Sequence, residues 1–212
     1  MSDDNAIKTS QKPSIVVMNQ LPAKSEVTSL AQSPLFNSAF NSVANDIELK
    51  ELALLGHLII RCNGEDKQLA FIIGGVLGLA LPSTLQSVRT DNMAVYWISP
   101  DEWLVICSSE KVYDLETSLN KAISGHCAIV NVSGGQTVLT IAGEGARTVL
   151  MKSTPYDVSD HNFPIGKVVT SAFAKSQAII CRIGDNQWEL IIRRSFANYI
   201  GLWLQKVCQN MD

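Results

Sequence analysis

Two short apolar runs in the first half of the chain are joined by a few polar residues, which is the pattern of a β-hairpin. MAVYWI (93–98) and WLVIC (103–107) read as its strands, and the polar residues 99–102 read as its turn. An apolar strand and an apolar helix precede this hairpin, and an amphipathic helix follows it. The expected order β-α-β-β-α therefore comes from segments 52–62, 65–79, 93–98, 103–107 and 110–124.

The second half of the chain shows the same order of patterns. Strands are expected at 128–132, 137–143, 167–174, 177–183 and 188–194, and a short helix at 143–153. SFANYIGLWLQKVCQ (195–209) reads as the final helix, with Ser195 placed to cap its start. The apolar face of this helix carries Phe196, Ile200, Trp203, Leu204 and Val207.

The two halves match each other at a constant offset. ISPDEWLVI (98–106) superimposes on IGDNQWELI (183–191) when shifted by 85 residues, which places Trp103 on Trp188. This spacing predicts an α+β fold of two pseudo-repeated βαββα units, each with an antiparallel sheet and helices on one face. In such a unit the tryptophan covers the end of the core, so we expect a structural role for it.

The N-terminal part of the chain has a different composition. Residues 1–45 are rich in polar residues and carry only brief apolar islands, which predicts a polar arm that is partly disordered or docked. LFNSAF (35–40) within the arm reads as a local packing motif, with docking on a neighbouring protein as the alternative. One domain is expected from 46 to 212, with repeats at about 46–125 and 126–212.

Composition narrows the classes of protein to consider. The net charge of -3 gives no electrostatic reason to bind nucleic acid or an anionic membrane. The longest apolar stretch, 69–82, is shorter than the roughly 20 residues of a membrane-spanning helix. The N-terminus lacks the apolar core of a secretory signal, and we expect a cytoplasmic protein. Five widely spaced cysteines without a CxxC pair are expected to be buried thiols: Cys62, Cys107, Cys127, Cys181 and Cys208.

Groups for catalysis or metal binding are sparse in the sequence. His57, His126 and His161 are dispersed, and no GxSxG or HExxH motif accompanies them. His126 adjoins Cys127, but neighbours on a strand point apart, so we expect an ordinary strand start there. SDHNF (159–163) reads as a turn, since it offers no second pair of metal ligands. The sequence therefore predicts no catalytic or metal-binding residue in this chain.

Glycine clusters raise the question of a phosphate site. GGVLG (74–78) lies inside an apolar helix and SGGQT (133–137) joins two strands, so neither fits a phosphate-binding loop. AGEGA (142–146) stands at a strand-to-helix junction, where free N–H groups could hold an anion. Glu144 already brings a carboxylate to that helix start, so we expect a helix cap and no cofactor site in this chain.

Four short motifs stand in a recognisable order along the chain. They are PDEW (100–103), Val132-Ser133 with Gln136-Thr137, Phe163-Pro164 with Gly166, and RSFA (194–197). With the segments between them, they resemble the gamma subunit of heterotetrameric sarcosine oxidase from about residue 50 to the C-terminus. Gly134-Gly135 departs from the family, which often has a basic or histidine-containing stretch there.

The resemblance implies a fold like the folate-binding domain of the glycine-cleavage aminomethyltransferase. It also implies partners, namely a large alpha subunit and the other subunits of a sarcosine oxidase. In such complexes sarcosine is oxidatively demethylated to glycine, O₂ is reduced to hydrogen peroxide, and tetrahydrofolate can capture the one-carbon unit. The resemblance places the FAD, FMN, NAD and tetrahydrofolate sites on the partner subunits.

Pattern and resemblance together predict a non-catalytic accessory subunit. The alternatives are a stand-alone tetrahydrofolate-binding or aminomethyl-transfer protein, in which Asp101 or Asp157 would supply the acid or base, and a partner of a different amine oxidase. Arg193 and Arg194 end a strand, and at least one of them should pair either inside the chain or with a partner. As a hypothesis, the partner interface comprises Arg194, Phe196, Tyr199 and Trp203, since Arg with aromatic residues is typical of interface anchors.

Overall fold

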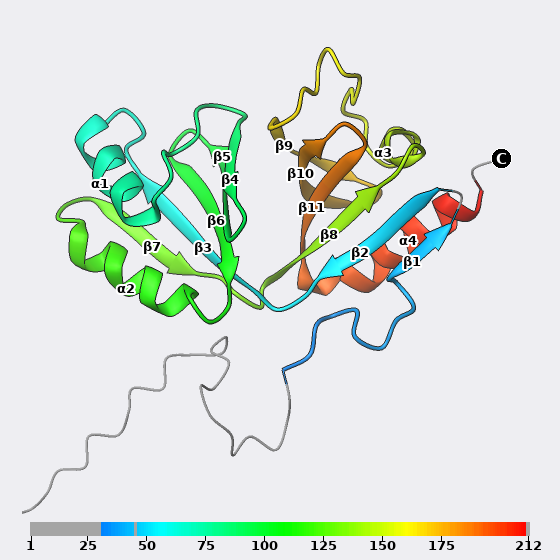
Figure 1. Ribbon diagram of the computed structural model, residues 1–212, viewed down its shortest axis with the longest axis horizontal. Helices are drawn as coiled ribbons and strands as arrows, with labels where there is room; N and C mark the ends of the chain where they lie inside the picture. Colours follow the sequence, from blue (N-terminus) through cyan, green and yellow to red (C-terminus); the bar gives the residue numbers. More distant parts are fainter. Residues whose placement is uncertain (1–30, 45, 211–212) are drawn as a thin grey trace, which may run out of the picture.

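Two antiparallel sheets lie face to face, and each carries helices on its outer side (Figure 1). The computed structural model describes residues 31–44 and 46–210. Three hydrophobic clusters fill the molecule, one between each sheet and its helices and a third between the two sheets. The α+β fold with antiparallel sheets, predicted from the sequence, is confirmed.

The first sheet has five strands in the order β4-β5-β6-β3-β7. Its strands are β3 (Leu55–Cys62), β4 (Ser87–Thr90), β5 (Met93–Ser99), β6 (Glu102–Ser108) and β7 (Cys127–Asn131). Helices α1 (Lys67–Leu77) and α2 (Val112–Ala122) cover its outer face. The side chain of Asp66 accepts the N–H of Leu69 to start α1, and Gly78 in the left-handed conformation ends it.

The second sheet has six strands in the order β1-β2-β8-β11-β10-β9. Its strands are β1 (Ser42–Ala44), β2 (Ile47–Leu52), β8 (Gln136–Ala142), β9 (Val168–Phe173), β10 (Ser176–Gly184) and β11 (Gln187–Arg193). Helices α3 (Ala146–Ser153) and α4 (Ala197–Gln209) cover it, and a 3-10 turn, η1 (Arg194–Phe196), leads into α4.

The internal repeat is visible in the hairpins. The β5–β6 pair shifts register between Trp97 and Ser99, and the β10–β11 pair shifts register between Arg182 and Gly184. The residues passed over, Ile98 and Ile183, are 85 positions apart. Each hairpin therefore carries a bulge at the same point, and the offset found in the sequence is a repeat in three dimensions.

Trp103 and Trp188 follow these bulges and are both buried. Trp103 belongs to the cluster beneath α1 and α2, and its indole N–H donates to the carbonyl of Pro82 at 3.0 Å. Trp188 belongs to the cluster beneath α3 and α4, packs edge-on against Phe163, and has no partner for its indole nitrogen. The structural role expected for the two tryptophans is confirmed.

One strand from each half of the chain joins the sheet of the other half. β7 follows residue 125 but pairs with β3, whereas β2 precedes residue 126 but pairs with β8. The β2–β3 and β7–β8 connections pass between the two halves (Figure 1). In each sheet the added strand takes the same place, antiparallel to the first strand of the repeat. The domain limits at 46 and 126 remain predictions.

Three local expectations from the sequence are wrong. The strand expected at 52–62 begins only at Leu55, because residues 53 and 54 form a turn after β2 in which Leu54 has φ +58°. β4, which pairs with β5, was not expected. Ser195 does not cap the last helix, because residues 194–196 form the 3-10 turn and Phe196 is the N-cap without a side-chain bond.

The described end of the N-terminal arm is docked on the second sheet and α4. Leu35 and Phe40 are buried in that core, where they lie against Gly201 of α4. Buried Glu51 accepts the hydroxyl protons of Ser33 and Thr137 at 2.6 and 2.7 Å. The packing motif expected at 35–40 therefore contacts this chain itself. The apolar island at 14–18 lies outside the described residues.

Candidate functional site

A buried polar cluster joins the two sheets. The guanidinium Nη2 of Arg89 on β4 lies 2.5 Å from Oε2 of Glu189 on β11, and the hydroxyl of Tyr96 on β5 donates to the same oxygen at 2.6 Å. Arg89 also donates to the Tyr96 hydroxyl oxygen at 3.1 Å. Glu189 and Tyr96 are buried and Arg89 reaches them from the surface. The cluster therefore neutralises a carboxylate that lies between two apolar sheet faces.

The chemistry of this cluster is that of a fixed ion pair. Burial, and then the Glu189 carboxylate, raises the pKa of Tyr96 well above its usual value, so its hydroxyl stays a donor. Next to it, the Ser87 hydroxyl lies 3.2 Å from the Cys181 sulfur. Burial raises the pKa of Cys181 to about 11, which keeps the thiol protonated and unreactive at neutral pH. We find a link between the sheets here, with no activated nucleophile.

A second set of charges holds the loop that follows α3. Arg182, itself buried, donates to the carbonyl oxygens of Phe163 and Asp185 at 2.9 and 2.7 Å and pairs with Asp160 at 2.6 Å. Arg147 on α3 also pairs with Asp160, through both oxygens of its carboxylate. The loop is thus fixed to β10 and α3, and the motif Phe163-Pro164-Gly166 serves its packing.

The histidines considered in the sequence lie far from a catalytic arrangement. His57 is buried on β3, where its Nε2 has no partner and burial lowers its pKa to about 4. His126 and His161 are exposed. Among residues 31–44 and 46–210, no group of three or more His, Cys, Asp or Glu side chains is arranged to hold a metal ion.

The two carboxylates considered as acid or base are surface groups. Asp101 accepts from the Ser99 hydroxyl and from Arg61, each at 3.0 Å, and these contacts lower its pKa. Asp157 accepts the backbone N–H and hydroxyl of Ser159, which lower its pKa as well. A general acid near neutral pH needs the opposite shift, so the geometry does not favour either residue in that role.

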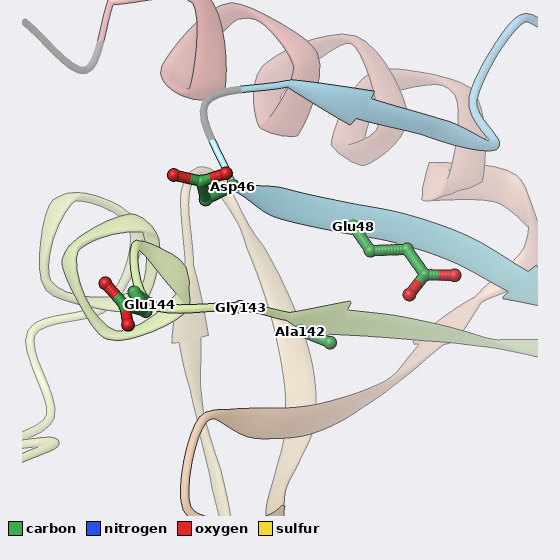
Figure 2. A pocket seen from close by; sticks show the side chains of 5 residues that line it. All are labelled: Asp46, Glu48, Ala142, Gly143 and Glu144. Carbon is green, nitrogen blue, oxygen red and sulfur yellow. The ribbon is translucent and has the colours of Figure 1, made fainter.

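The glycine cluster 142–146 borders an acidic hollow. Figure 2 shows the side chains of Asp46, Glu48 and Glu144 around the backbone of Gly143. Three carboxylates repel a phosphate group, so the hollow does not suit the anion considered from the sequence. The expected capping role of Glu144 is wrong, because α3 begins after Gly145 without a side-chain cap.

The four residues of the predicted interface lie on η1 and the first half of α4, up to its middle residue Trp203, and differ in accessibility. Arg194 is exposed and donates to the backbone carbonyl of Gln32 at 2.9 Å. Phe196 is 41% exposed. Tyr199 and Trp203 are half-buried: the Tyr199 hydroxyl accepts the N–H of Lys175, and the Trp203 indole donates to Ser153. The four residues thus lie on two consecutive elements, η1 and α4, and three of them hydrogen-bond to other segments of this chain.

Sequence reasoning missed the inter-sheet cluster and the loop clamp. Glu189 and Arg182 each stand between apolar neighbours on a strand, as WEL and CRI show. A charged residue inside a strand buried on both faces must find an internal partner, and this was the available signal. Their partners Arg89 and Asp160 lie in segments without a periodic pattern, so the pairs themselves left no signal.

The sequence matches the model of the family described as "Sarcosine oxidase, gamma subunit family" over residues 61–210. Sarcosine oxidase subunit gamma from Corynebacterium sp. (strain P-1) is 27% identical over 186 residues, covering 84% of this chain and 90% of that protein. The subunit gamma from Arthrobacter sp is 28% identical over 187 residues, with the same coverage.

Two solved structures are similar in fold. A chain of the heterotetrameric sarcosine oxidase from Corynebacterium sp. U-96 in complex with pyrrole 2-carboxylate matches with a TM-score of 0.78 and 24% identity, over 86% of this chain and 96% of that chain. Glycine cleavage system aminomethyltransferase T from Bartonella henselae matches with a TM-score of 0.57 and 12% identity, over 81% of this chain and 48% of that chain. Within the described residues, no helix is long and apolar enough to cross a membrane.

Proposed function

The chain belongs to the sarcosine oxidase gamma subunit family, and from this premise we propose that it is a non-catalytic accessory subunit of a heterotetrameric sarcosine oxidase. It packs against a large alpha subunit and stabilises the assembly. The complex oxidatively demethylates sarcosine to glycine with formation of hydrogen peroxide and passes the one-carbon unit to tetrahydrofolate. FAD, FMN, NAD and tetrahydrofolate are bound by the partner subunits.

One observation supports this proposal above the others. The buried charged side chains of the described residues, Glu51, Arg182 and Glu189, are all engaged inside the chain. Each of them joins segments distant in sequence, so their charge is used to hold the fold. A site for a polar substrate needs such groups aimed at an open cavity, with part of their bonding capacity left for the ligand.

The contact with the partner is proposed on η1 and α4, through Arg194, Phe196, Tyr199 and Trp203. Phe196 supplies exposed apolar surface, and Arg194 supplies a charge beside it. The half-buried rings of Tyr199 and Trp203 are already positioned by hydrogen bonds, so little side-chain entropy is lost when a partner covers them.

Co-expression of the four subunits with and without this chain tests the proposal. We expect the other three subunits to fail to associate stably with one another and to lose their sarcosine-dependent formation of peroxide, and adding back the purified chain to restore both. A stable, fully active complex of the other three subunits would overturn the proposal. Gel filtration reports assembly, and a peroxide assay reports turnover.

The alternative is a stand-alone tetrahydrofolate-binding or aminomethyl-transfer protein. The similarity in fold to aminomethyltransferase T is the observation that supports this alternative. Calorimetric titration of the isolated chain with tetrahydrofolate separates the two functions. The accessory role predicts no heat of binding from the chain alone, and saturable binding at one site supports the alternative.

A further inference from the structure

Cys62 and Cys127 face each other across two antiparallel strands. Cys62 is the last residue of β3 and Cys127 the first of β7, and the two are direct partners in the register of the strands. Both side chains belong to the cluster between this sheet and its helices, so they point to the same side. The sequence separates them by 65 positions, and the fold brings them together.

Their place in the ladder is a non-hydrogen-bonded pair. The N–H of Val132 bonds to the carbonyl of His57, so residues 57 and 132 are a hydrogen-bonded pair. Such pairs alternate with non-hydrogen-bonded ones along an antiparallel ladder, and the register places Cys62 and Cys127 at a non-hydrogen-bonded position. In agreement, neither backbone N–H points to the other cysteine: that of Cys62 donates to the carbonyl of Asp101, and that of Cys127 donates to the carbonyl of Gly125. Side chains approach most closely at such pairs, with Cα atoms about 4.5 Å apart.

The two thiols interact with each other and differ in their environment. Burial raises the pKa of both, that of Cys62 to about 12, and their mutual hydrogen bond raises the pKa of Cys62 further while it lowers that of Cys127. Cys62 is 6% exposed, whereas Cys127 is half-buried. Cys127 is therefore the thiol that solvent reaches and that ionises first.

A hollow gives access to the pair from outside. It has a volume of about 590 Å³, and both sulfur-bearing residues line it together with Arg61, Asp101, Gly125 and His126. Cys107 and Cys181 differ in this respect, since each is buried in a core. Of the cysteines, Cys62 and Cys127 thus combine a partner thiol with a path for a small polar oxidant.

We propose that Cys62 and Cys127 form a dithiol that hydrogen peroxide oxidises to a reversible disulfide between β3 and β7. The Cys127 thiolate attacks one peroxide oxygen, the O–O bond breaks, and the departing hydroxide takes a proton to become water. The Cys62 thiolate then attacks the resulting sulfenic sulfur, the S–O bond breaks, and a second water leaves. Two thiols and one peroxide yield one disulfide and two waters.

The oxidant is the product of the reaction proposed above, and only this link to turnover rests on the proposed function. A Cα separation of about 4.5 Å is at the short end of the range for disulfides, and strained disulfides are reduced more easily. The bond is therefore expected to reopen with a dithiol reductant. Because the thiolate is the reacting form, oxidation should be slow at neutral pH and accelerate about tenfold per pH unit below the pKa.

Treatment of the full-length chain with hydrogen peroxide, followed by alkylation and non-reducing peptide mapping, tests the proposal without any partner subunit. We expect one linked peptide pair containing Cys62 and Cys127, two hydrogen atoms lighter than the separate peptides, which dithiothreitol splits again. Independent alkylation of both thiols after exposure, or oxidation that dithiothreitol does not reverse, would overturn it. Loss of subunit assembly would bear on the proposed function and leave this result unaffected.

Two variants separate the roles of the thiols. With Cys62→Ser, Cys127 should stop at the sulfenic acid, which dimedone traps, whereas Cys127→Ser should abolish both dimedone labelling and the linked peptide. Cys107→Ser is the matched control, because it removes a buried thiol of the same sheet and should leave the linked pair unchanged. Dimedone labelling of Cys62 in the Cys127→Ser chain would contradict the assignment.

Discussion

Arg89 and Glu189 are 100 positions apart in sequence and form an ion pair of 2.5 Å between the two sheets. Arg89→Ala leaves the buried Glu189 carboxylate without its counter-charge, which costs 3–5 kcal/mol for a fully buried pair. Because the Arg89 side chain is 37% exposed, we expect a loss near the lower end, about 3 kcal/mol. Urea denaturation measures it, with Tyr96→Phe as the control at about 1.5 kcal/mol for one hydrogen bond to a charge. Equal losses in both variants would contradict the ion-pair assignment.

The two tryptophans give a prediction that uses their different environments. Replacing either Trp103 or Trp188 with Ala should cost about 3–5 kcal/mol, since each deletes a buried aromatic side chain. Phe should be tolerated better at 188 than at 103 by about 1 kcal/mol, because only Trp103 has a hydrogen bond to lose. Thermal denaturation of the four variants checks this. Losses under about 1 kcal/mol for both Ala variants would place the tryptophans outside the core.

His57 predicts a dependence of stability on pH. Its pKa falls from 6.5 in the unfolded chain to about 4 in the fold, so the unfolded state binds more protons between these values. Above pH 6.5 His57 does not lower the free energy of unfolding. As the pH falls from 6.5 toward 4, proton uptake by the unfolded chain lowers that free energy by about 3 kcal/mol. Denaturation curves at several pH values should show this slope, and His57→Leu should remove it. His126→Gln, at an exposed histidine, should leave the slope in place.

Gly143 and Gly75 should respond to alanine in opposite directions. A Cβ at Gly143 would lie 1.8 Å from the backbone oxygen of Asp46, and its φ of +112° is strained for other residues. Gly143→Ala should therefore destabilise by more than about 3 kcal/mol. Gly75 lies within α1 with open space around it, and Gly75→Ala should stabilise by about 0.5–1 kcal/mol. A neutral result at Gly143 would mean that β2 does not lie against β8 there.

Arg194 separates a partner contact from an internal role. Arg194→Ala should weaken co-purification with the large subunit and leave the melting temperature of the isolated chain nearly unchanged, because its bond to Gln32 is exposed. Arg193→Ala, at the neighbouring exposed arginine, is the control and should co-purify normally. A chain that melts several degrees lower yet assembles fully would place the function of Arg194 within the fold.

The sequence predicted those parts of the fold that depend on local patterns. Apolar runs on either side of a polar turn identified both hairpins, and the matching segments around Trp103 and Trp188 identified the duplication, because each signal lies within about ten residues. β2 and the Arg89–Glu189 pair were not predicted, because each depends on a partner about 100 positions away in the sequence, and no local periodicity indicates such a partner. The same reason hid the Cys62–Cys127 pair, which was interpreted as two separate buried thiols.

The exchange of β2 and β7 also has a consequence for synthesis on the ribosome. The five-stranded sheet is complete once residue 131 has emerged, so it can fold while the rest of the chain is still being made. β2 emerges earlier but pairs with β8, Glu48 lying opposite Ala142, and its apolar residues Ile47 and Leu49 must wait for that strand. This high contact order predicts that closure of the six-stranded sheet limits the folding rate.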